Sequence, residues 1–389
     1  MKPILFVTHR ADRTGAPIVL LHFLRWLKRN SDIPFEVLIR GGGPLAGEHE
    51  QIAKVINLRF WGFLERNFKR IRLEKVGNRL NTFFTKRMLR RRQYSLLYSN
   101  TATNHSILAA LTHLECPVIT HIHELNGVII NETGLRNFQN TVSSSDYLIA
   151  ASKAVARNLT ENHSVPEEKI SVVYEAIPAR EIDSRDWGNA RRRIRNDLGI
   201  LPGTVLIGGM GYISRRKGTD LFIRLADQVL ENFTDRFAFV WIGGGGPWAR
   251  ISMARSAERS GWRVNQVHWT GSRPNPLDYL ASLDIFCLTS REDPYPLVML
   301  EAAALGRPVV GFSGSGGFDE FVRNVGGVAL PFEDVDAMVA EVIRLANSPH
   351  ERGEIGDRLR EKVLVRHDME VMANQLLAVI RKVMAQPAP

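Results

Sequence analysis

Two carboxylates flank a proline-rich junction in the second half of the chain, where residues 291–301 read Arg-Glu-Asp-Pro-Tyr-Pro-Leu-Val-Met-Leu-Glu. The junction follows the apolar run 285–288, which predicts a buried strand, and leads into a predicted helix. Pro296 suits the first turn of that helix, where a missing N–H would be unpaired anyway. The first helical amides, near Leu297 and Val298, should then point towards the strand end and form a site for an anion.

Asp293 and Glu301 should reach the two ends of one ligand lying across this helix start, because Asp293 precedes the helix and Glu301 lies just over one turn inside it. A carboxylate accepts two hydrogen bonds at once, so the pair suits a ligand rich in hydroxyls, such as a sugar or a ribose. The alternative is structural: Glu292 and Asp293 cap the helix dipole and Glu301 is solvated. Spacing alone does not decide between the two.

A glycine-rich turn followed by three cations is a second candidate site, at residues 208–218, which read Gly-Gly-Met-Gly-Tyr-Ile-Ser-Arg-Arg-Lys-Gly. Glycines let a ligand approach the backbone, and Arg215, Arg216 and Lys217 supply positive charge for a diphosphate. A surface turn with solvated charges is the alternative. The glycine run 243–246 is a third candidate, and it fits a simple tight turn equally well.

The first half of the chain offers two further candidates. Gly15 lies in the turn between the first predicted strand and a helix that opens at Pro17, where backbone amides would be available to a ligand. Alternation places His121 and His123 on one face of a strand, and with Glu124 they suggest zinc. No third ligand lies at a familiar spacing, so we expect no metal. A plain strand-to-helix turn and a buried histidine are the structural alternatives.

Short apolar runs alternate with amphipathic stretches along the whole chain. Such alternation predicts parallel sheets covered on both faces by helices. The predicted strands are 4–8, 35–39, 96–98, 118–122, 147–150, 171–174, 205–208, 238–242, 267–270, 285–288 and 308–311. The series is interrupted by the polar, arginine-rich stretch 179–203, which we predict to be a linker and the entry to a second unit, and a candidate hinge.

The predicted fold class is therefore α/β, with two doubly wound, Rossmann-like domains at residues 1–178 and 204–369. Ligands are expected at the carboxyl ends of the strands. The helix predicted at 370–386 could pack back on either domain. A chain of 389 residues is too long for one ordinary core, which agrees with two domains.

The bulk composition limits the class of protein. No apolar run approaches the ~20 residues needed to cross a bilayer. The two isolated cysteines, Cys116 and Cys287, build neither a disulfide framework nor a metal site. From these features we expect a cytoplasmic protein.

The net charge of +10 is concentrated in residues 59–92, where twelve Lys or Arg and two Glu give the same excess as the whole chain. Aromatic residues are interleaved with these cations, which is typical of a segment lying on an anionic membrane surface. A solvated helical insert is the alternative, and nucleic acid is not expected as a partner. The predicted membrane-surface residues are Trp61, Arg87, Arg90, Arg91 and Arg92.

The junction at 293–301, with Gly-Arg-Pro-Val-Val at 306–310, resembles the acidic-x7-Glu signature of retaining glycosyltransferase family 4, bacterial surface-polysaccharide type. The family usually has Glu where this chain has Asp293. Lys217 before Gly218 and His123 before an acid also match, whereas Tyr212 stands where the family has an arginine. The resemblance covers nearly the whole chain.

The resemblance implies the GT-B fold, with two Rossmann-like domains facing a central cleft. It implies transfer of a sugar from a nucleotide-diphosphate sugar to a hydroxyl of a glycan or lipid-linked acceptor, in polysaccharide or glycolipid synthesis. It also implies that no metal cofactor is needed and that the protein can lie on the inner face of the membrane. The implied catalytic residues are His123 and Asp293 beside the transferred sugar and Glu301 on the ribose. The implied donor-binding residues are Gly15, Arg216 (with Arg215 less favoured), Lys217, Gly244, Leu297, Val298 and Glu301.

Two other interpretations stay open. One is a nucleotide-sugar epimerase or a phosphorylase on the same fold, and the other is a non-enzymatic membrane or nucleic-acid adaptor built on the basic window. Asp334-Val335-Asp336 spells the Asp-x-Asp of metal-dependent glycosyltransferases, but it precedes a predicted helix, so we expect Asp334 to be an N-cap.

Overall fold

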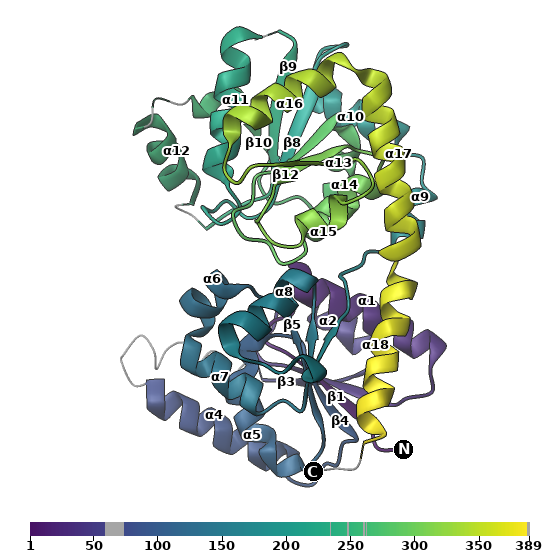
Figure 1. Cartoon of the computed structure of the whole chain (residues 1–389). Helices are drawn as coiled ribbons and strands as arrows, with labels where there is room; N and C mark the ends of the chain where they lie inside the picture. The colour runs from purple at the N-terminus through teal and green to yellow at the C-terminus, as the bar shows by residue number, and fades with distance from the viewer. Residues whose placement is uncertain (59–73, 234, 247–248, 260, 262, 387–389) are drawn as a thin grey trace. The chain divides into compact units, whose positions relative to one another are not determined.

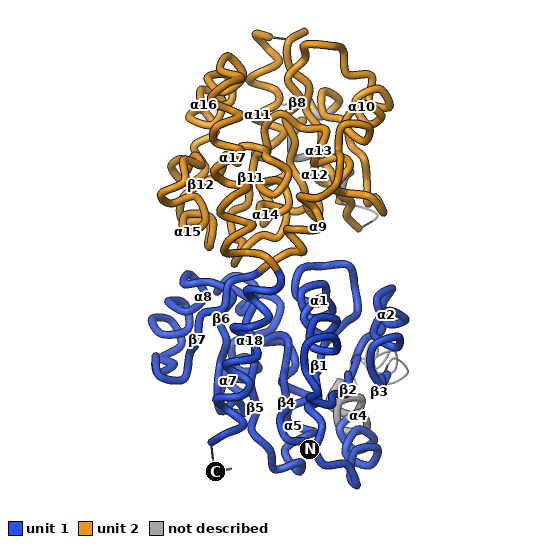
Figure 2. The backbone as a smooth tube through the Cα atoms, turned by 90° about the vertical axis from the view of Figure 1, so that its right-hand side faces the viewer, with its two compact units in different colours: residues 1–175, 369–389 blue, residues 176–368 orange. Residues whose placement is uncertain are grey.

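The computed structural model describes residues 1–58, 74–233, 235–246, 249–259, 261 and 263–386. The chain divides into two compact units (Figure 2): unit 1 holds residues 1–175 and 369–389, and unit 2 holds residues 176–368. The chain passes from one unit to the other twice. Within unit 2 the two crossing segments are hydrogen bonded, since Ile177 N donates to His367 O (3.1 Å) and Arg180 N donates to Asp368 Oδ2 (3.1 Å).

Unit 1 is built on a seven-stranded parallel sheet in the order β3-β2-β1-β4-β5-β6-β7 (Figure 1). Its strands are β1 (Ile4–Thr8), β2 (Phe35–Ile39), β3 (Lys54–Asn57), β4 (Leu96–Ser99), β5 (Val118–Ile122), β6 (Tyr147–Ala150) and β7 (Ile170–Val172). Its helices are α1 (Gly15–Asn30), α2 (Ala46–Glu50), α4 (Glu74–Leu89), α5 (His105–Leu111), α6 (Asn126–Val128), α7 (Leu135–Ser143), α8 (Lys153–Arg157) and α18 (Met369–Met384). Shorter helical segments are η1 (Ala102–Asn104), η2 (Thr112–Leu114), η3 (Ile129–Thr133), η4 (Asn158–Asn162) and η5 (Glu167–Lys169).

Unit 2 is built on a six-stranded parallel sheet in the order β10-β9-β8-β11-β12-β13. Its strands are β8 (Val205–Met210), β9 (Phe237–Ile242), β10 (Val267–Trp269), β11 (Ile285–Leu288), β12 (Val309–Phe312) and β13 (Val328–Leu330). Its helices are α9 (Ala179–Asp183), α10 (Gly188–Asp197), α11 (Thr219–Asn232), α12 (Ala249–Arg259), α13 (Pro276–Ser282), α14 (Leu297–Ala304), α15 (Phe318–Val322), α16 (Val335–Asn347) and α17 (Pro349–Arg366), with the short η6 (Val264–Gln266). The predicted two doubly wound parallel sheets are confirmed.

In both sheets the strand order reverses beside the first strand, between β1 and β4 in unit 1 and between β8 and β11 in unit 2. Doubly wound folds bind ligands at such a reversal, at the carboxyl ends of the strands. The fold therefore directs attention to the loops that follow these four strands.

Alternating side chains on β1 explain why helices cover both faces of the first sheet. Phe6 packs edge-on against Phe23 of α1, with ring centroids 6.0 Å apart. Leu5 and Val7 point to the other face, where they share a core with Leu89 of α4 and Ile107 of α5.

Two strands were not predicted, β3 and β13, and both lie at the edge of a sheet. They have four and three residues. Among these seven residues only Ile56 is fully buried, so neither strand carries the apolar signal of a central strand. All the predicted strands are present, and their observed ends differ from the predicted ends by at most two residues.

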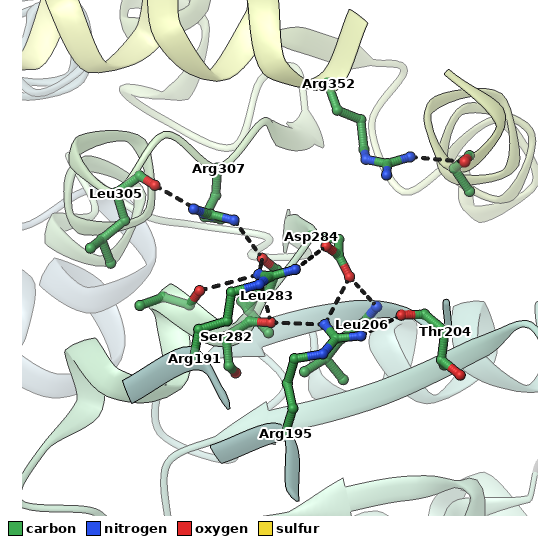
Figure 3. Close-up of polar contacts among 12 residues, drawn as sticks. Arg191, Arg195, Thr204, Leu206, Ser282, Leu283, Asp284, Leu305, Arg307 and Arg352 are labelled. Atoms are coloured by element: carbon green, nitrogen blue, oxygen red, sulfur yellow. Dashed lines mark hydrogen bonds and ion pairs between the residues drawn. The ribbon is translucent and has the colours of Figure 1, made fainter. Parts of the chain in front are cut away.

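Residues 179–203, predicted to be a linker and the entry to the second unit, carry α9 and α10 and belong to unit 2. Two arginines of α10 explain the ordered structure. Arg191 donates to Leu283 O (2.6 Å) and pairs with Asp284 Oδ1 (2.6 Å), and Arg195 pairs with Asp284 Oδ2 (3.0 Å). Arg307 donates to Leu283 O as well (2.9 Å). We call Arg191, Arg195, Arg307 and Asp284 the arginine cluster (Figure 3).

Helix α18 packs on α1 and belongs to unit 1, although it follows all of unit 2 in the sequence. Its buried side chains include Met372, Leu376 and Ile380, each at most 1% exposed. The predicted N-cap is confirmed, since Asp334 Oδ1 accepts from Ala337 N (2.9 Å). Among the described residues, no helix combines the length and apolar character required to span a bilayer.

Candidate functional site

The loop after β8 closely approaches the end of β11 because Gly218 permits it. Gly218 has a φ of +65°, and a Cβ atom there would lie 1.7 Å from the Thr289 carbonyl oxygen. Thr289 Oγ1 donates to Lys217 O (3.2 Å), which fixes the loop in that place. A larger residue at position 218 would therefore separate the two loops that bring the predicted donor-binding residues together.

Lys217 and Asp293 form a buried ion pair at the carboxyl edge of the second sheet. Lys217 Nζ lies 2.5 Å from Asp293 Oδ2, and the side chains are 16% and 8% exposed. Ser290 Oγ also donates to Asp293 Oδ2 (3.2 Å), and the Asp293 amide donates to Ser315 O (2.7 Å). The structure thus joins a cation and an acid that lie 76 residues apart in the sequence.

Helix α14 begins at Leu297, and its N-cap residue, Pro296, makes no side-chain hydrogen bond to the first amides. Asp293 is occupied with Lys217 and Ser290 instead, so the structural alternative of Asp293 as a helix cap does not apply. Leu297 and Val298 are both half-buried in the first turn. The N-terminal end of α14 therefore keeps amides and a dipole available to an anion.

Glu301 lies inside α14 with a half-buried side chain. Burial raises its pKa from the usual 4.5 to about 7, and no cation of the described residues offsets the shift. A carboxyl group in this state has unfulfilled hydrogen-bonding capacity that a ligand hydroxyl would satisfy.

Arg215 and Arg216, the two cations before Lys217, make different contacts. Arg216 Nη1 donates to Glu292 O (2.8 Å), so this guanidinium links the two loops, while the Arg215 side chain is exposed. Arg291 also holds this loop: it donates to Arg215 O (2.8 Å) and pairs with Asp220 (2.7 Å). The sequence reasoning missed Arg291 because its partner lies in another strand–helix unit.

The glycine run after β9 joins the same site. Ile213 N donates to Gly244 O (2.9 Å), and Gly246 N donates to the hydroxyl of Tyr212 (2.6 Å). Tyr212, at the position where an arginine was expected, is 59% exposed and ties the two glycine turns together. This role was not predicted from the sequence.

In unit 1, His123 follows β5 and is held at both ring nitrogens. Nδ1 contacts Glu175 Oε1, and Nε2 lies 3.3 Å from Asn100 Oδ1. Burial alone would lower the pKa of His123, but Glu175 and Glu124 raise it above the usual value. Glu175 was missed by the sequence reasoning because it lies 52 residues away, beyond β7.

The neighbouring Glu124 has a structural task. Its carboxylate accepts hydrogen bonds from the Thr101 hydroxyl and from the amides of Ala102 (3.3 Å) and His123 (2.8 Å). It thereby fixes the backbone at the ends of β4 and β5.

Gly15 is the first residue of α1 and is exposed, and Thr14 makes no side-chain cap. Asn100 Nδ2 donates to Ala16 O (2.8 Å), so the start of α1 is tied to the end of β4. Through Asn100, the predicted residues Gly15 and His123 belong to one carboxyl edge of the first sheet.

Within the described residues, His121, His123 and Glu175 place potential metal-ligand atoms within 4.8 Å of one another. Glu175 supplies the third potential ligand that could not be found from sequence spacing. However, His123 Nδ1 and Glu175 Oε1 are in direct hydrogen-bond contact, whereas two ligands of one tetrahedral zinc lie about 3.3 Å apart. The other ring, His121, binds the Tyr98 hydroxyl through Nδ1 (2.8 Å). The arrangement is that of a hydrogen-bonded pair.

The end of α4 carries part of the predicted membrane surface. Arg87, Arg90 and Arg91 are exposed. Arg92 differs in its contacts: its guanidinium pairs with Glu36, which also accepts from the Tyr94 hydroxyl (2.7 Å), so its place on the membrane surface stays a prediction. Trp61 lies outside the described residues.

Comparison with known families gives matches in both units. Residues 13–181 match the family described as Glycosyltransferase Family 4, and residues 202–348 match Glycosyl transferases group 1. The chain is 26% identical to a D-inositol 3-phosphate glycosyltransferase of Kribbella flavida over 62% of this chain and 58% of that protein. The chain thus spans less than two thirds of that relative's length. It is 23% identical to an uncharacterized glycosyltransferase of Methanocaldococcus jannaschii, over 74% and 75%.

Solved structures show the same fold. The crystal structure of Anabaena HepE in complex with UDP-glucose matches with a TM-score of 0.80 at 18% identity, covering 98% of this chain and 100% of that one. Sucrose-phosphate synthase from Thermosynechococcus elongatus matches with a TM-score of 0.76 at 16% identity, over 99% and 100%. These likenesses confirm the GT-B architecture expected from the sequence.

Proposed function

Because the chain belongs to the glycosyltransferases of the family 4 type, we propose that it moves a sugar from a nucleotide-diphosphate sugar to an acceptor hydroxyl with retention of anomeric configuration. The observation that carries the proposal is the convergence of Lys217, Asp293 and the uncapped start of α14 at the carboxyl edge of unit 2. A cation and a free helix dipole suit a diphosphate, and an acid beside them suits sugar hydroxyls.

In this proposal Glu301 binds the ribose, Asp293 binds the transferred sugar, and His123 of unit 1 acts beside that sugar. As the sugar–phosphate bond breaks, negative charge accumulates on the leaving diphosphate. Lys217 and the amides of Leu297 and Val298 stabilise that charge, which lowers the barrier because they are held in place before the reaction. We propose that the leaving phosphate takes the acceptor proton and that no metal cofactor is required.

A screen of nucleotide sugars by thermal unfolding tests the donor, since a ligand that binds only the folded protein raises its stability. We expect one UDP- or GDP-sugar to raise the midpoint, and Glu301→Ala to abolish the rise. Nucleoside diphosphate should be released only when an acceptor is added. Release without acceptor, or conversion of the donor sugar alone, would support the epimerase or phosphorylase alternative.

We also propose that the acceptor is a glycan or a lipid-linked glycan and that the basic end of α4 contacts an anionic membrane. Phe83 and Met88 are 60% and 43% exposed beside Arg87, Arg90 and Arg91. Each arginine near an anionic surface contributes about 1 kcal/mol. Exchange of these three arginines for Gln should weaken binding to phosphatidylglycerol vesicles about a hundredfold.

A matched control for the vesicle experiment is the exchange of three exposed arginines of unit 2, Arg192, Arg255 and Arg259. It changes the net charge equally and should leave most of the vesicle binding intact. Equal losses in the two triple variants would show that only net charge matters, and would remove the membrane role from α4.

A further inference from the structure

We propose that Glu175 is a positioning residue of the transfer reaction: it holds His123 as a doubly protonated imidazolium, so that His123 donates a hydrogen bond to the substrate instead of accepting a proton. The inference rests on the proposed function for the identity of the reaction. The hydrogen-bond geometry around the His123 ring supports it independently of any substrate.

The first part of the geometry concerns Nδ1. It contacts Oε1 of Glu175, and the two side chains are only 9% and 6% exposed. A carboxylate oxygen accepts hydrogen bonds, so the proton of this contact belongs on Nδ1. The buried contact also makes the pairing of opposite charges strong, because little water screens it.

The second part concerns Nε2, which lies 3.3 Å from Asn100 Oδ1. The orientation of the Asn100 amide is determined by its other end, since Nδ2 donates to the Ala16 carbonyl (2.8 Å) and a carbonyl can only accept. The atom that Asn100 presents to His123 is therefore an acceptor, and Nε2 must carry a proton as well. Two acceptors at the two nitrogens require the imidazolium form.

The charged groups around the His123 ring favour a positive charge on His123. Glu124 lies beside His123 and, with Glu175, raises its pKa against the effect of burial. His121 stacks on His123 with ring centroids 4.0 Å apart, and burial together with the His123 charge lowers its pKa well below the usual value.

Residues around the end of β1 complete these surroundings. Burial and Arg10 lower the pKa of His9 to about 4, so His9 is neutral; Asp12 opposes this shift, and Arg40 and His123 add to it. Among the histidines near this edge, His123 therefore carries the positive charge.

The contact at Nε2 is weak enough for a substrate to replace it. At 3.3 Å the bond to Asn100 is long, and a hydroxyl or phosphate oxygen at normal hydrogen-bond distance would compete well for the same proton. Glu175 is also the last residue of unit 1 before the chain crosses to unit 2. The proposed sugar-side histidine is thus bonded to the residue from which the crossing starts.

The decisive experiment is a proton titration of His123 by NMR, with ¹³C at histidine Cε1 and the resonance assigned by its loss in His123→Gln. In the wild-type protein the midpoint of His123 should lie above the usual 6.5. In Glu175→Gln the amide still accepts from Nδ1 but the charge is gone, and the midpoint should fall by about one pH unit or more. Glu168→Gln, an exposed carboxyl group of the same unit, should leave the midpoint unchanged.

Glu175→Asp keeps the charge, so it should retain a raised midpoint and serves as a second variant if Glu175→Gln folds poorly. A wild-type midpoint at or below 6.5, or equal midpoints in the wild type and Glu175→Gln, would overturn the inference. The titration needs no substrate, so it remains informative even if no nucleotide sugar binds and the proposed function fails.

The pH profile of turnover separates a donor from a base. With the nucleotide sugar found in the thermal screen and an acceptor, the rate of sugar transfer should fall as the pH rises through the His123 midpoint, and this limb should move to lower pH in Glu175→Gln. A rate that rises through the same midpoint would identify His123 as a base and contradict the inference.

Discussion

The amino ends and the carboxyl ends of the strands in unit 2 use buried charge in opposite ways; we call them the amino edge and the carboxyl edge of the sheet. At the amino edge, the arginine cluster surrounds Asp284 with donors that are all directed at fixed protein groups (Figure 3). Burial would raise the pKa of Asp284, but Arg191, the Leu206 amide and Arg195 hold it below the usual value. At the carboxyl edge the pKa of Glu301 is raised to about 7, and α14 starts without a side-chain cap.

This difference distinguishes a structural site from a binding site within one sheet. The amino edge is satisfied internally, so its charges stabilise the fold of unit 2. The carboxyl edge retains an acid with a raised pKa and a helix start without a side-chain cap, and their hydrogen-bonding capacity is available to a ligand. Mutations at the two edges should therefore separate stability from binding.

The largest effect is expected for Asp284→Asn. It leaves Arg191 and Arg195 buried without their counter-charge, which should destabilise unit 2 by about 3–5 kcal/mol. Denaturant unfolding measures the loss. Asp278→Asn is the control, because its partner Arg193 is 57% exposed and the pair should contribute less than about 1 kcal/mol. Equal losses in both variants would contradict the assigned role of the amino edge.

Lys217→Met should affect binding more than stability. The variant removes a charge-assisted bond to the diphosphate, so the affinity for nucleoside diphosphate should fall about ten- to hundredfold. Affinity for the nucleoside alone should hardly change, and calorimetric titration measures both. Arg224→Met, which removes a surface pair with Asp336, is the control. A similar loss for nucleoside and diphosphate would argue against a phosphate role for Lys217.

Glu301→Gln should stabilise the free protein above neutral pH. The unfolded carboxyl ionises near pH 4.5 while the folded one keeps its proton until about pH 7, so wild-type stability falls as the pH rises through this window. The variant should be more stable than the wild type by about 2 kcal/mol at pH 8 and by little at pH 4. Hydrogen exchange of the α14 amides measures this. A gain that is equal at both pH values would indicate better packing instead of relief of a buried charge.

The smallest effect is expected for Asp293→Asn. Loss of the negative charge frees Lys217, so binding of nucleoside diphosphate should strengthen severalfold. Sugar transfer should nevertheless decrease, because the amide is a weaker acceptor for sugar hydroxyls. Weaker diphosphate binding in this variant would show that Asp293 positions Lys217 and does not compete for it.

The central strands could be predicted from the sequence because each is a short, apolar run between polar segments, such as 285–288. The edge strands β3 and β13 could not, since their exposed side chains remove that signal. The helices within residues 179–203 could not be predicted because arginine-rich composition is typical of solvated segments. Arg191 and Arg195 instead direct their charge inward, towards carbonyl groups and Asp284.

The same limit applies to the candidate site. Local motifs located Lys217, Asp293 and Glu301 because each belongs to one loop or helix start. Arg291, which holds the loop before Lys217, and Glu175, which holds His123, act across strands, and no local spacing reveals a contact made by the topology of the sheet. Arg92 shows the converse, since a basic run concealed one residue that belongs to an internal pair.

The placement of α18 has a consequence for how the protein forms during synthesis. Domains generally fold as units in the order in which the ribosome produces them. Here every residue of unit 2 emerges before residues 369–384, which complete the surface over α1. The unit that starts first is therefore finished second, and a nascent chain stopped at position 368 would carry a complete unit 2 beside a unit 1 whose apolar α1 surface still lacks its cover.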